Sequence, residues 1–205
     1  MKYIIGNLKD SLNDKNVQKY VDIISKNKYE GLIICPSYEY LKYFDNMKNI
    51  GNQDYYEDRN EKYVIIGHYD RRDTIQEIKE KIKKATEKNI TIILCIGNKK
   101  LYDIEDIKNQ LDKYLDKICI KDIIIAYEPI SMIGNNKEID IEKLNECITY
   151  IKKYFNNKVK VIYGGNVNEK NISNILEICD GILAGRLSFD PQKFTYIIDK
   201  YIKKV

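Results

Sequence analysis

Short apolar runs alternate with longer charged segments along most of the chain. The runs are rich in Ile and Val and are apolar on both faces, which is typical of parallel strands buried on two sides. Eight runs are candidate strands, of which the third is the weakest: Tyr3–Ile5, Leu32–Cys35, Asn49–Gln53, Tyr63–Ile66, Ile90–Ile96, Ile123–Tyr127, Val159–Tyr163 and Gly181–Leu183.

Six of the intervening segments carry apolar side chains three or four residues apart, the spacing of one helix face. One such stripe joins Ile75, Ile78 and Ile82, with Asp73 or Thr74 in position to cap it. Strands alternating with helices predict an α/β fold, a (β/α)8 barrel formed as a single domain by residues 1–205. A doubly wound sheet is the alternative, and periodicity alone does not exclude it.

The third unit of this barrel is predicted to be incomplete. Between Gln53 and Tyr63 the sequence reads QDYYEDRNEKY, which is too short for a helix and two loops. About ten extended residues reach roughly 33 Å, enough to return along a wall near 17 Å tall. We therefore expect the third helix and its loop to be largely missing, and Tyr55 and Tyr56 to cover the strands there.

The composition of the chain argues against several classes of binding partner. The 35 basic and 31 acidic residues are interspersed and give a net charge of +4, so no nucleic acid is implied. No apolar stretch approaches the roughly 20 residues that span a bilayer, and a strand begins too early for a signal peptide. The cysteines form no CxxC motif and there is one histidine. This pattern favours reduced cysteines in a cytoplasmic protein and argues against a zinc site.

Three polar side chains follow apolar runs directly. His68 ends the run in YVIIGHYDRR, Glu128 ends IIAYE, and Lys9 follows YIIGN. The carboxyl ends of barrel strands meet at one face, where the active sites of such barrels lie. A base, an acid and a cation are therefore predicted to meet at that face.

Six motifs, taken in order from end to end, resemble the triosephosphate isomerase family. They are GNLK, YVIIGHYDRR, IILCIG, IIAYEPISMIG, VIYGGNVNEKN and DGILAGR. The resemblance implies a (β/α)8 TIM barrel that interconverts dihydroxyacetone phosphate and glyceraldehyde 3-phosphate through an enediolate, a step of glycolysis and gluconeogenesis. It implies no cofactor and no metal.

The same resemblance assigns roles to individual residues. Glu128 is implied to be the catalytic base, His68 a neutral electrophile held neutral by the helix that follows it, and Lys9 a cation for the developing charge. Asn7 is implied to line the pocket. The substrate phosphate is implied to bind backbone N–H groups and a helix N-terminus, at Gly134, Asn166, Gly185 and Arg186.

Several positions differ from the family pattern. Tyr69 replaces a serine, and Asp70, beside the catalytic groups, replaces a glutamate. Asn98 replaces a glutamate and Ser131 a tryptophan that are partners in the family. Arg186 replaces a glycine and Asn166 a serine.

The family's dimer depends on a long loop after the third strand, which Gln53–Tyr63 is too short to form. A monomer is therefore favoured. Two other functions stay open: an isomerase for another small ketose phosphate, such as a four-carbon one, and a non-catalytic phosphate-binding barrel.

Overall fold

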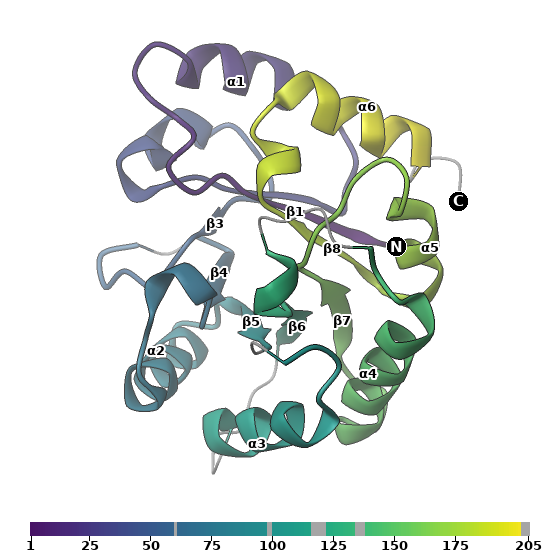
Figure 1. Ribbon diagram of the computed structural model, residues 1–205. Helices are drawn as coiled ribbons and strands as arrows, with labels where there is room; N and C mark the ends of the chain where they lie inside the picture. Colours follow the sequence, from purple (N-terminus) through teal and green to yellow (C-terminus); the bar gives the residue numbers. More distant parts are fainter. Residues whose placement is uncertain (60, 98–99, 116–121, 134–137, 202–205) are drawn as a thin grey trace.

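The eight strands form one parallel sheet whose edges meet. The computed structural model describes residues 1–59, 61–97, 100–115, 122–133 and 138–201. The strand order is β2-β1-β8-β7-β6-β5-β4-β3, and a parallel bridge between Ile34 and Ile50 joins β2 to the residue before β3. The sheet thus closes into the expected barrel (Figure 1). The strands are β1 Tyr3–Asn7, β2 Leu32–Cys35, β3 Gly51–Asn52, β4 Tyr63–Ile66, β5 Thr91–Ile96, β6 Ile123–Tyr127, β7 Lys160–Tyr163 and β8 Gly181–Ala184.

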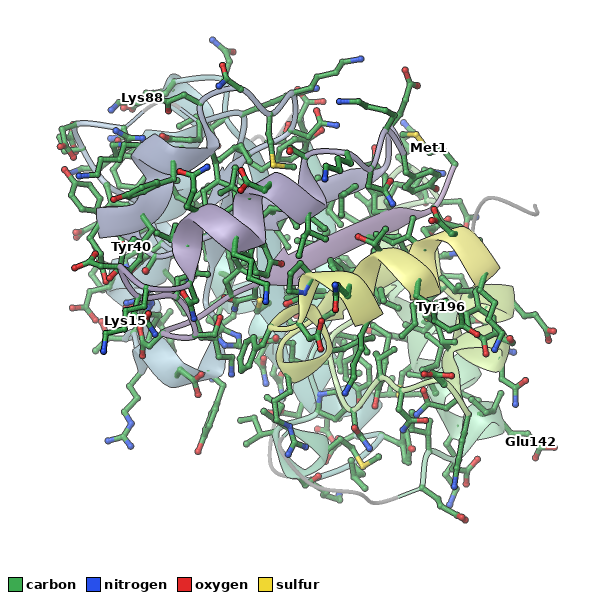
Figure 2. The ribbon with its side chains drawn as sticks, turned by 90° about the horizontal axis from the view of Figure 1, so that it is seen from above. Met1, Lys15, Tyr40, Lys88, Glu142 and Tyr196 are labelled. Atoms are coloured by element: carbon green, nitrogen blue, oxygen red, sulfur yellow. The ribbon has the colours of Figure 1, made fainter. Side chains whose placement is uncertain are left out.

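Helices surround most of this barrel (Figure 1). They are α1 Val17–Ile24, α2 Ile75–Glu87, α3 Ile104–Leu115, α4 Ile141–Tyr154, α5 Ile172–Ile178 and α6 Pro191–Tyr201. The helices α1 and α6, from opposite ends of the chain, lie side by side (Figure 2). Thr74 caps α2 as the sequence predicts, in a reciprocal pair of hydrogen bonds with Glu77. None of the helices in the described ranges is long and apolar enough to cross a membrane.

The strands bury both faces, as their composition predicts. Alternate residues such as Ile5, Ile65 and Ile93 point into the barrel and form one apolar cluster. Their neighbours, such as Ile4 and Ile92, pack outward beneath the helices in a second cluster. This two-sided burial holds the strand ends at fixed positions, which the site described below requires.

In the described residues, the ring of outer helices is incomplete in two units of the barrel. The described residues between β3 and β4 contain no helix, in agreement with the expected connector. The second unit is also reduced, which the sequence analysis did not anticipate: a 3-10 segment, η1 Tyr38–Phe44, takes the place of its helix. Leu41 and Phe44 are buried there and stand three residues apart, the repeat of a 3-10 turn. The third strand is also shorter than expected, because it consists of Gly51–Asn52 alone, with Ile50 before it in an isolated bridge.

The short connector after β3 folds back onto α2. Asp54 accepts from Lys81 at 2.8 Å, and Glu57 pairs with Lys84 at 3.1 Å. Tyr55 packs against the outer apolar cluster, with the ammonium groups of Lys84 and Lys88 5.9 and 5.4 Å from its ring centre. Tyr55 therefore covers the strands as expected.

Tyr56 lies beside the barrel instead. Its ring packs edge-on against the ring of Tyr38, with their centres 4.8 Å apart. Tyr56 is not part of the outer apolar cluster and does not pack against it. Of the two tyrosines expected to replace the missing helix, only Tyr55 thus packs on the core.

Removing Tyr55 is expected to destabilise the barrel. Tyr55→Ala should lower the free energy of unfolding by about 1–2 kcal/mol, less than the ~3–5 kcal/mol of a fully buried aromatic side chain, because Tyr55 is partly exposed. The measurement is urea denaturation followed by circular dichroism. Tyr196 on α6 (Figure 2), 51% exposed, is the matched control; Tyr196→Ala should change stability by less than about 0.5 kcal/mol. Equal losses for both variants would contradict the covering role.

Candidate active site

One cavity opens at the carboxyl ends of the strands. It measures about 220 Å³ and is lined by both polar and apolar residues. Ile133, Leu187 and Phe189 contribute apolar surface. The site residues expected from the sequence and described in the structure line it together: Asn7, Lys9, His68, Glu128, Asn166, Gly185 and Arg186.

His68 and Glu128 contact each other directly. They follow β4 and β6, and their side chains are 6% and 4% exposed. The Nδ1 atom of His68 lies 3.0 and 2.9 Å from the two carboxylate oxygens of Glu128. Glu128 lies close against the β7 end as well, since a Cβ at Gly164 would stand 2.5 Å from its Cγ. Gly164 is therefore required for this close approach, and not only for a turn.

The contact with Glu128 changes the pKa that is expected for His68. Burial lowers the pKa of His68, but the charge and hydrogen bond of Glu128, with help from Asp70, outweigh burial, so the pKa lies above its ordinary value. His68 stands at the N-cap of a single 3-10 turn, η2 Tyr69–Arg71, and α2 begins at Ile75 as the sequence predicts, too far away to outweigh the adjacent carboxylate. In the free protein these contacts favour a raised histidine pKa over the low one expected from the sequence.

Because the chain has one histidine, the pKa of His68 can be measured by NMR. We expect its ring protons to titrate above pH 6.5 in the wild-type protein. Because the folded-state value is raised, the stability that protonation provides is present below about pH 6.5 and is lost as the pH rises through the folded-state pKa. In Glu128→Gln the titration should move to lower pH, since burial remains while the negative charge is gone. An unchanged titration in that variant would show that Glu128 is not the cause.

Asp70 links the histidine to the lysine. Its Oδ2 accepts from the Lys9 ammonium at 2.6 Å and lies 3.3 Å from His68 Nε2, which makes no hydrogen bond of good geometry. Partial burial would raise the pKa of Asp70, but Lys9 and then His68 outweigh it and hold the pKa below its usual range. Acidic and basic side chains therefore alternate from Glu128 through His68 and Asp70 to Lys9.

The backbone of Lys9 is held in an unusual conformation. Its φ of 47° lies in the left-handed region, which is unfavourable for a residue with a side chain. Asn7 Oδ1 accepts from its N–H at 3.2 Å, and Gln53 Nε2 donates to its carbonyl at 2.9 Å. Gln53 also donates to Cys35 O and accepts from Arg71. Sequence reasoning missed Gln53, although it too is a polar residue just after a strand and could have been found in that way.

Three of the four residues expected to bind the substrate phosphate form one wall of the cavity. Asn166 follows β7, and Gly185 and Arg186 follow β8. Gly134 and Asn98 lie outside the described residues. The helix N-terminus at this wall is that of η4 Arg186–Ser188, a single 3-10 turn with Gly185 at its N-cap, whereas the longer α6 begins at Pro191.

Among the described residues, one group of three side chains brings potential metal-ligating atoms close together. His68, Cys95 and Glu128 each place one such atom within 4.8 Å of the others. However, His68 and Glu128 already bond to each other, and burial, then Glu128, raises the pKa of the Cys95 thiol well above its usual range. A thiol kept protonated is a poor metal ligand, so these residues suit a proton-transfer site better than a metal centre.

Comparison with known proteins relates this site to one family. A family model described as triosephosphate isomerase matches residues 2–201. The triosephosphate isomerase of Ureaplasma parvum serovar 3 is 30% identical over 236 positions, covering 98% of this chain and 99% of the relative. That of Mycoplasmoides gallisepticum is 30% identical over 245 positions, with 97% of each chain covered. That of Campylobacter concisus is 36% identical over 146 positions, covering 67% of this chain and 63% of the relative. The two longer alignments exceed the 205 residues present here, so those relatives contain segments that this chain lacks.

Proposed function

Because the chain belongs to the triosephosphate isomerase family, we propose that Lys9, His68 and Glu128 carry out the family's reaction at the mouth of the barrel. That reaction interconverts dihydroxyacetone phosphate and glyceraldehyde 3-phosphate, so the protein is an aldose–ketose isomerase acting on a small phosphorylated sugar. The observation that supports these residue roles is the meeting of a carboxylate, an imidazole and an ammonium at one cavity.

Each group has a defined task, assigned as in the family, which is itself a standard example of tuned acid and base groups. The Glu128 carboxylate takes a proton from the carbon beside the substrate carbonyl. The electrons of that C–H bond form the enediolate double bond, and negative charge develops on the carbonyl oxygen. Lys9 and His68 stabilise that oxygen. The proton of the hydroxyl group on the deprotonated carbon passes to the former carbonyl oxygen, and Glu128 returns its own proton to the former carbonyl carbon, so that the hydroxyl and carbonyl groups exchange places. Because Glu128 and His68 bond to each other at 2.9 Å, the substrate has to separate them when it binds.

The non-reacting end of the substrate is assigned to the wall formed by the residues that follow β7 and β8. Asn166, Gly185 and Arg186 are proposed to hold the phosphate there. Asn7 supports Lys9 through its backbone N–H, and Asp70 fixes the Lys9 ammonium. None of these tasks calls for a cofactor or a metal.

A coupled assay on glyceraldehyde 3-phosphate with purified protein tests the proposal. We expect turnover that is lost in Glu128→Gln, and lower turnover with a four-carbon ketose phosphate. Faster turnover of the four-carbon substrate would instead indicate the related isomerase. Phosphate binding without any turnover would indicate a non-catalytic barrel.

We also propose a cytoplasmic location. Cys35, Cys95, Cys147 and Cys179 are free and buried, which is typical of proteins that are kept in a reducing compartment. The place of the family's reaction in glycolysis supports the same location.

A monomer is proposed for the oligomeric state. The connector after β3 lies against α2 through Asp54–Lys81 and Glu57–Lys84, so its described residues do not project as an arm. We expect sedimentation velocity to give a mass near 24.2 kDa at every dilution from micromolar to nanomolar. A dimer that persists at nanomolar concentration would contradict the proposal.

A further inference from the structure

The charges around the cavity are not all compensated. Four ionisable side chains line it: Lys9, His68, Glu128 and Arg186. Lys9 is paired with Asp70 at 2.6 Å, and His68 with Glu128 at 2.9 Å. Arg186 is exposed, and no carboxylate among the described residues forms an ion pair with its guanidinium. Within the part of the chain that the structure describes, Arg186 is thus the cation of this cavity left without a counter-charge.

The position of Arg186 is set by the barrel. In the sheet, Gly6 of β1 pairs with Ala184 of β8, so the residues that follow these two strands are neighbours. A Cβ at Gly185 would meet the Lys9 Cε at 3.6 Å. Arg186 comes next in the chain, at the rim of the cavity and on the wall that also contains Asn166.

We propose that the Arg186 side chain is a specificity-determining residue, whose guanidinium binds the substrate's dianionic phosphate and so selects phosphorylated over unphosphorylated sugars. This inference rests on the proposed function and goes beyond it, since the family pattern has a glycine at this position and offers only a backbone N–H group there. A guanidinium presents paired N–H donors that match two phosphate oxygens, and it stays charged at any working pH.

The remaining charges strengthen the argument. Asp70 already neutralises Lys9, and the Glu128–His68 pair adds no net positive charge, so neither can attract an incoming dianion strongly. Arg186 contacts the non-reacting end of the substrate, which keeps its charge throughout the reaction. Its contribution is therefore expected mainly in KM, with a smaller change in kcat.

Kinetics on two substrates test the proposal. Arg186→Ala should lower kcat/KM for glyceraldehyde 3-phosphate about tenfold, as expected for a charged hydrogen bond weakened by exposure, and should leave the rate with unphosphorylated glyceraldehyde unchanged. Arg186→Lys should recover part of the loss, because it restores the charge without the paired donors. Lys170, exposed in the loop between β7 and α5 at the same end of the barrel, is the matched control, and Lys170→Ala should behave like wild type.

Inorganic phosphate, titrated by calorimetry, separates this proposal from the assignment of the reaction. Weaker binding to Arg186→Ala by about tenfold, with Lys170→Ala unchanged, would support Arg186 even if the wild-type protein showed no isomerase activity. Equal phosphate affinity in wild type and Arg186→Ala would overturn it, as would an equal loss of rate on both sugars.

Discussion

Replacing Glu128 by aspartate is expected to lower kcat on the order of 10²-fold, because a shift of about 1 Å in a reacting group can cost that much. The shorter side chain draws the carboxylate back from the substrate carbon by one methylene. The β7 end packs directly against the Glu128 stem at Gly164, so the stem cannot shift toward β7 to compensate. The measurement is kcat in the coupled assay, with KM determined alongside.

Glu142 provides the control for this variant. It is exposed on the first turn of α4 (Figure 2) and lines no part of the cavity. Glu142→Asp makes the same chemical change away from the site and should retain wild-type kcat. If Glu128→Asp turned over at the wild-type rate, Glu128 could not be the group that moves the proton.

The position of the site was predictable from the sequence because strand ends are visible in it. Lys9, His68 and Glu128 each follow an apolar run, and a parallel barrel brings the carboxyl ends of all its strands to one face. Their presence around one cavity follows from topology alone. The same reasoning located the strands, whose uniform burial requires uniformly apolar runs.

The contacts between these side chains could not be predicted in that way. The bond between His68 and Glu128 depends on side-chain directions across two strands, for which the spacing of residues carries no information. The sequence predicts a low histidine pKa from the helix that follows, which begins at Ile75 with Thr74 as its cap as expected. The pKa is raised instead by the Glu128 carboxylate, a contact that the spacing of residues does not reveal. Likewise, the segment Tyr38–Phe44 is only 7 residues long, too short for its apolar spacing to distinguish a 3-10 turn from an α-helix.

Replacing Lys9 by glycine or alanine is expected to lower kcat/KM by about 10²–10³-fold, the usual cost of removing one preorganised group that stabilises a developing oxyanion. The ammonium is held at 2.6 Å by Asp70, so it is in position before the charge develops. Neither small side chain can restore that charge. Steady-state kinetics on glyceraldehyde 3-phosphate measures the loss, and wild-type activity in either variant would remove Lys9 from the mechanism.

The two Lys9 variants should differ in stability although they share the loss of activity. Lys9 has a φ of 47°, a conformation that glycine adopts freely and alanine does not. We therefore expect Lys9→Gly to unfold at higher urea than Lys9→Ala, with a difference of about 1 kcal/mol. Asp70 loses its partner in both variants, so that cost cancels in the comparison. Equal stability would mean that the backbone relaxes once the ammonium is gone, and that Lys9 itself, rather than Asn7 and Gln53, maintains the left-handed conformation.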